Sequence, residues 1–76
     1  MDLPPETIEI TLKVYLRQMR VRLDETVSIA KAAEACADSG NIQKGVEIAL
    51  DVEQLLYEVN TFLNAASLIH RLSKSQ

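Results

Sequence analysis

The stretch IQKGVEIALDVEQLLYEVNTFLNAASLIHRL, residues 42–72, carries apolar side chains on two sides of one helix. Its main face recurs at steps of three and four residues, which is the spacing of an α-helix face. The members of this face are Ile48, Val52, Leu55, Val59, Phe62, Ala66 and Ile69, widened on one flank by Ala49, Leu56 and Leu63. Leu50, Tyr57 and Leu68 fall on the opposite side. A helix that packs against one partner needs one apolar stripe, so this stretch predicts a helix with more than one partner.

A short polar turn segment separates this helix from an earlier one. No proline or glycine interrupts residues 6–39, and Pro4 and Pro5 suit a helix start because the first turn has no intrahelical N–H bonds to lose. Gly40 can take the left-handed conformation that ends a helix. Asn41 can then cap the next helix by accepting from a backbone N–H.

The sequence therefore predicts one helix over about residues 5–38, a turn over 39–41 and a second helix over about 42–73. So short a connection forces the two helices to lie antiparallel and adjacent. The first helix offers its own apolar face to the second, made of Ile8, Leu12, Tyr15, Leu16, Met19, Leu23, Val27, Ala30, Ala33 and Ala37. Gly45 costs about 1 kcal/mol of helix propensity against alanine, and it permits a close helix approach.

The size of the chain indicates association. A single domain of 76 residues with two helices buries little apolar surface and needs some further support. Cys36 is the only cysteine, so disulfides are excluded, and Cys36 and His70 are too few soft ligands for a zinc site. We therefore expect an all-α antiparallel hairpin that associates into a four-helix bundle, as a dimer or with a helical protein partner. Its core residues at the open end would be Tyr15, Leu16, Met19, Leu56, Phe62 and Leu63.

A second contact is predicted on the back of the hairpin. Ile10, Val14 and Val21 point away from the main face of the first helix, at about the level of the residues in the last turns of the second helix. A contiguous exposed apolar patch marks a contact site, whereas scattered apolar residues need no explanation. The residues predicted for this second contact are Val14, Val21, Leu50, Tyr57 and Leu68.

A basic group on the first helix is the leading polar hypothesis. Lys13, Arg17 and Arg20 form one helical stripe, with Arg22 close by. These cations can bind RNA phosphates, meet an acidic partner, or pair with Asp24 and with acidic residues of the second helix. No aromatic residue interleaves them, and the net charge of −3 argues mildly against nucleic acid.

Catalytic signatures are missing from the sequence. It has no Gly-rich phosphate loop, no Ser/His/Asp or Cys/His constellation, and no Glu-x-x-His pattern for a di-metal site. We therefore expect no enzymatic activity, cofactor or metal. The acidic N-terminus does not resemble a signal peptide, no stretch is apolar enough to span a membrane, and a single thiol fits a reducing compartment, so a cytoplasmic protein is expected.

Two resemblances extend this interpretation. In its design the chain is similar to the plasmid copy-number RNA-binding hairpin, which dimerises into a four-helix bundle; this implies an RNA-binding face at Lys13, Arg17 and Arg20. Over most of its length the chain resembles the small co-chaperones of bacterial type III secretion. Those are helical hairpins whose second helix ends in an alanine- and isoleucine-rich stretch, and residues 62–70, FLNAASLIH, look similar. That resemblance implies a non-enzymatic module that shields a partner's amphipathic helix, and it is the preferred prediction.

Overall fold

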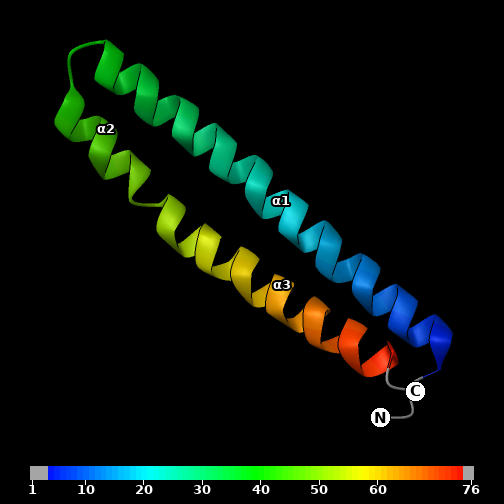
Figure 1. Ribbon diagram of the computed structural model, residues 1–76. Coiled ribbons are helices and arrows are strands. Elements are labelled where there is room, and N and C mark those ends of the chain that lie inside the picture. The colour runs from blue at the N-terminus through cyan, green and yellow to red at the C-terminus, as the bar shows by residue number, and fades with distance from the viewer. Residues whose placement is uncertain (1–3, 75–76) are drawn as a thin grey trace.

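The computed structural model describes residues 4–74 as an antiparallel helical hairpin (Figure 1). The first arm is α1 (Pro5–Asp38), and the second arm is formed by α2 (Ile42–Ala49) and α3 (Val52–Lys74) in succession. Together the arms make a rod of 56 × 15 × 12 Å. The predicted all-α antiparallel hairpin is thus confirmed.

The turn between the arms is built by Gly40 and Asn41. Gly40 has a φ of 100°, and the backbone N–H groups of Gly40 and Asn41 donate to the carbonyls of Ala37 and Cys36. This pair of bonds is the glycine-terminated motif that satisfies the last carbonyls of a helix. The side chain of Asn41 accepts from the N–H of Lys44 and caps α2. Both residues therefore act as the sequence predicted.

The second arm differs from the prediction of one continuous helix over 42–73. It is interrupted at Leu50 and Asp51, where the N–H groups of Asp51 and Glu53 bond three residues back instead of four. Such bonds tighten the helix locally and change its direction. Figure 1 shows this break in the second arm, opposite an unbroken α1.

The break lies between two different contacts of the arms. Near the turn, a Cβ added to Gly45 would lie 2.7 Å from the backbone oxygen of Ala33, so the arms touch almost backbone to backbone. On the other side of the break, the rings of Tyr15 and Phe62 lie between the arms with their centroids 5.7 Å apart.

The seam between the arms follows a strict alternation of three- and four-residue steps, the pattern of a coiled coil. In α1 its buried and half-buried members are Ile8, Leu12, Tyr15, Met19, Arg22, Thr26, Ile29, Ala33 and Cys36. In the second arm they are Gly45, Ile48, Val52, Leu55, Val59, Phe62, Ala66 and Ile69. The main face predicted for the second helix is therefore confirmed.

The face predicted for the first helix is wrong in its middle. Leu16, Leu23, Val27 and Ala30 are exposed, and the seam passes through Arg22, Thr26 and Ile29 in their place. The prediction followed the most apolar side chains, whereas the seven-residue period of the packing rotates the contact line away from them.

The seam buries little. Among residues 4–74 only Ala33, Gly45 and Ala66 are classed as buried, and no large side chain is fully enclosed. In a rod of two helical arms, the opposite arm covers each seam residue on one side only, and solvent reaches its remaining sides. The hairpin alone therefore lacks the enclosed core that normally stabilises a domain.

Candidate protein-interaction surface

One flank of the seam carries most of the large exposed aliphatic residues. In an antiparallel pair of helices, residues that directly follow seam positions in both arms lie on one flank, and residues that directly precede them lie on the other. We call the aliphatic members of the first flank the aliphatic side; they are Leu16, Leu23, Val27, Ala30, Ile42, Val46, Ala49, Leu56 and Leu63. Polar residues lie among them, at Arg20, Glu34, Glu53 and Asn60, and occupy the flank toward the open end, at Glu9, Lys13, Ser67 and His70.

Residues of the aliphatic side lie level with one another in pairs, one from each arm, and we call each pair a rung. The register set by the Ala33–Gly45 and Tyr15–Phe62 contacts places one leucine of α1 level with one leucine of α3, twice in succession. One heptad nearer the turn, the rung has alanine on both arms. The rungs are Leu16 with Leu63, Leu23 with Leu56, and Ala30 with Ala49.

These side chains are open to solvent. Leu16 is 57% exposed and Leu63 47%, while Ile42 beside the turn is 68% exposed. The large aliphatic residues gather over the middle of the rod and toward its turn, beside polar residues such as Arg20 and Asn60, and such a group differs from single scattered exposure. Such a group is the mark of a surface that packs against another molecule.

The opposite flank carries a polar cluster that joins the two arms, and the exposed Val14, Val21 and Leu68 lie on the same flank. Nε of Arg22 lies 2.8 Å from Oε1 of Glu58 and joins the two arms, while Nη1 of Arg22 donates to the side chain of Gln18. The guanidinium also lies 4.8 Å from the centre of the Phe62 ring, within the range of a cation–π contact. Hydrogen bonds from the Gln54 and Arg22 side chains hold the pKa of Glu58 below its ordinary value. This cluster aligns the two arms.

The predicted core residues divide between the seam and the aliphatic side. Tyr15, Met19 and Phe62 are half-buried in the seam. Leu16, Leu56 and Leu63 are the exposed rungs described above. The predicted core residues are therefore only partly covered within the single hairpin.

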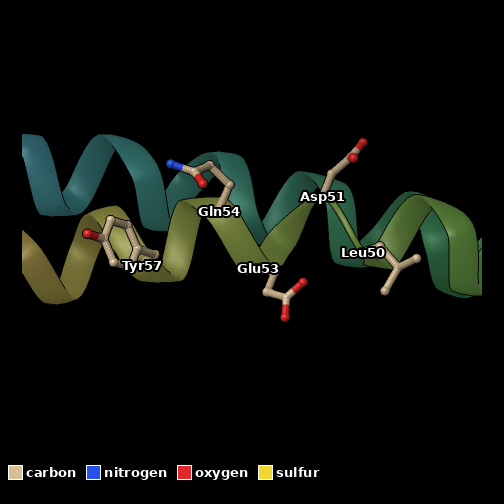
Figure 2. A pocket seen from close by; sticks show the side chains of 5 residues that line it. All are labelled: Leu50, Asp51, Glu53, Gln54 and Tyr57. Carbon is tan, nitrogen blue, oxygen red and sulfur yellow. The ribbon is translucent and has the colours of Figure 1, made fainter.

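The residues predicted for the second contact are all exposed, and some of them line two shallow depressions. Val14 lines a shallow depression of about 210 Å³ with Ile10, Lys13 and Arg17, all from α1. A second depression, of about 420 Å³, is lined from the second arm alone by Leu50, Asp51, Glu53, Gln54 and Tyr57. In Figure 2 these five side chains project from the outer side of the arm around the helix break, with α1 behind them. Val21 and Leu68 are also exposed, but neither lines either depression.

The basic stripe is exposed and in part paired within α1. Lys13 lies 3.0 Å from Glu9, and Arg20 lies 2.8 Å from Asp24, each one helical turn away. Arg17 is exposed beside the first depression. Exposed ion pairs of this kind contribute little to stability, so little free energy is lost when one of these cations binds another partner instead.

Other candidate groups lie apart from one another. Cys36 is a half-buried seam residue near the turn, and His70 is exposed in the last turns of α3. Within residues 4–74 no group of three His, Cys, Asp or Glu side chains is arranged to hold a metal ion. In the same residues no helix is both long and apolar enough to cross a membrane.

No protein-family model, no curated protein and no solved structure matches this chain.

The aliphatic side contains residues that the sequence interpretation assigned elsewhere. Leu23 and Val27 were expected between the arms, and Ile42 and Val46 were not singled out. The signal that identifies them is the strict heptad through Arg22 and Thr26, in place of the longest run of apolar residues.

Proposed function

We propose that the chain is a non-enzymatic protein-binding module that completes a helical bundle with other helices, in the manner of a co-chaperone or assembly adaptor. The observation that carries this proposal is the aliphatic side, a group of exposed apolar residues on a hairpin that encloses almost no core. Each of its leucines is already about half covered, so enclosing the remainder is worth roughly 1 kcal/mol per leucine. A second helical layer that covers several of them would stabilise the rod substantially.

A helical partner fits the shape of this flank. The rungs repeat along the rod axis every seven residues. Each apolar position, a or d, of an amphipathic helix laid along the rod repeats at the same spacing. The outer stripe that includes Tyr57 and Leu68 would then offer a further contact to a partner protein. A secretion co-chaperone, which shields an amphipathic helix until its owner assembles, would use surfaces of this kind.

The test separates the two surfaces. A protein captured from the native cell is identified and purified, and its affinity is measured for the wild-type chain and two variants, Leu23→Glu/Leu56→Glu and Tyr57→Glu/Leu68→Glu. We expect at least one of these variants to lose more than about 100-fold in affinity, since each would bury carboxylates without partners. Ser28→Glu/Thr61→Glu, which adds the same charge at exposed polar positions, is the matched control and should bind as wild type.

An RNA-binding hairpin is the rival outcome. Replacing Lys13, Arg17 and Arg20 by glutamine would abolish retention of RNA if these cations hold phosphates, and retention by the wild-type chain would fall steeply with salt. The proposed function would be overturned if RNA binding weakened steeply with salt while both glutamate variants bound the partner protein as the wild type does.

A further inference from the structure

The charges of the hairpin are segregated along its length. The half nearest the turn, residues 24–55, has seven acidic and two basic residues, a formal charge of −5. The open half, residues 4–23 and 56–74, has three acidic and six basic residues, a formal charge of +3. The rod is therefore electrically bipolar, although its net charge is small.

The rungs of the aliphatic side also differ along the same axis. The open half presents Leu16 with Leu63 and, next to the middle, Leu23 with Leu56, whereas the rung of the turn half is Ala30 with Ala49. The turn half also carries the exposed Val27, Ile42 and Val46 on this side, so the difference in size is confined to the rungs. Facing layers pack best when large side chains lie opposite small ones.

We propose that the occupant of the aliphatic side is a second copy of this chain, packed with its turn at the opposite end of the rod. In this arrangement the acidic half of each copy covers the basic half of the other. The Leu16–Leu63 rung of each copy approaches the Ala30–Ala49 rung of the other, and the two Leu23–Leu56 rungs meet near the middle. If both turns lay at the same end, the two acidic halves would face each other and every rung would face its own counterpart.

The size of the contact suits a stable dimer. The long side of a rod 56 Å by 15 Å offers on the order of 800 Å² per copy, which is the area each partner buries in a standard specific interface. A two-fold axis across the rod uses the same side of both copies, as a closed dimer requires. The opposite flank with Arg22 and Glu58 and the outer stripe with Tyr57 would stay uncovered.

This inference deepens the proposed function, because it names the helices that complete the bundle. Sedimentation equilibrium at about 50 µM should give the mass of two chains for the wild type. Leu23→Glu/Leu56→Glu should weaken the dimer more than about 100-fold, since four carboxylates would meet at the interface. Ser28→Glu/Thr61→Glu should remain dimeric, and circular dichroism should show helix content in all three chains.

The orientation is measured by electron spin resonance between two labels. Ser39→Cys in a Cys36→Ala background places one label at the turn of each copy. Opposite turns predict a separation on the order of 50 Å, close to the length of the rod, whereas turns at the same end predict less than about 20 Å. The short distance would overturn the proposed orientation.

A wild-type chain that stays monomeric would overturn the dimer, even if it bound another protein through the aliphatic side and so supported the proposed function. A dimer with the long distance that captures no other protein would support this inference while the proposed function failed.

Discussion

At the scale of single residues, Gly45 sets how closely the arms approach. It lies inside α2, where alanine would raise helix propensity by about 1 kcal/mol. A Cβ at this position would, however, lie 2.7 Å from the Ala33 carbonyl oxygen and 3.3 Å from the Cβ of Ala37. The obstacle is backbone, which cannot move aside as a flexible side chain can.

Gly45→Ala is therefore expected to lower the free energy of unfolding by about 1 kcal/mol, because the cost of overpacking exceeds the gain in propensity. Urea denaturation at fixed protein concentration measures this change. Asn60→Ala, at an exposed position of α3, isolates the propensity gain and should be neutral or stabilising. A stabilised Gly45→Ala chain would mean that the arms are not in close contact there.

Glu58 gives the hairpin a pH dependence with a definite sign. Its pKa in the folded chain is lowered from an ordinary value of 4.5 by the Gln54 and Arg22 side chains. The ionised carboxylate consequently stabilises the fold at pH values above the ordinary value. That stabilisation is lost as the pH falls through the lower pKa of the folded state.

Glu58→Gln should accordingly be less stable than wild type at neutral pH, and the gap should narrow as the pH falls below 4.5. Urea midpoints across that range provide the measurement, with the exposed Glu25→Gln as the control for a lost carboxylate. A gap that stays constant with pH would show that the Arg22–Glu58 contact does not depend on the ionised carboxylate.

At the scale of helices, local sequence signals predicted the ends of elements better than their interiors. Gly40 and Asn41 act within a few residues of backbone, so their chemistry alone predicts the turn. The break at Leu50 and Asp51 has no proline or glycine to announce it. It lies between the close approach at Gly45 and the Tyr15–Phe62 ring contact, and no local signal in residues 50 and 51 indicates it.

The same distinction explains the partly wrong face of α1. Leu23 and Val27 are more apolar than Arg22 and Thr26, so a ranking by hydrophobicity prefers them for the contact with the second arm. The actual seam accepts Arg22 because its guanidinium reaches Glu58 and covers the Phe62 ring. The leucine and valine are thereby left on the outside, where they form the candidate site.

The break also predicts uneven protection along the second arm. The N–H groups of Asp51 and Glu53 bond three residues back, in the poorer geometry of a tight turn. Hydrogen exchange measured by NMR should show these amides exchanging at least about 10-fold faster than those of Thr26 and Val27, at nearly the same level of α1. Equal protection in both arms would indicate that the second arm is continuous in solution.

At the scale of the whole molecule, charge and shape act together. A thin rod with an open apolar flank is poorly stabilised alone, and stability gained by association depends on protein concentration. The segregation of charge determines which way round a second copy packs. Added salt distinguishes the two orientations of the dimer. It screens attraction between unlike halves when the turns lie at opposite ends, and repulsion between like halves when they lie at the same end.

Self-association of the wild-type chain should weaken by about 3- to 10-fold as ionic strength rises from about 0.05 to 0.5 M, because screening removes the attraction between unlike halves. Lys13→Gln/Arg17→Gln/Arg20→Gln should associate less tightly at low salt and respond less to added salt, since it lowers the positive charge of the open half. Arg71→Gln/Lys74→Gln removes two exposed positive charges at the end of α3 and serves as the comparison variant. It shows whether the loss of affinity depends on where in the open half the positive charge is removed. Sedimentation measures each dissociation constant, and association that strengthens with salt in this range would instead place like halves together, with both turns at one end.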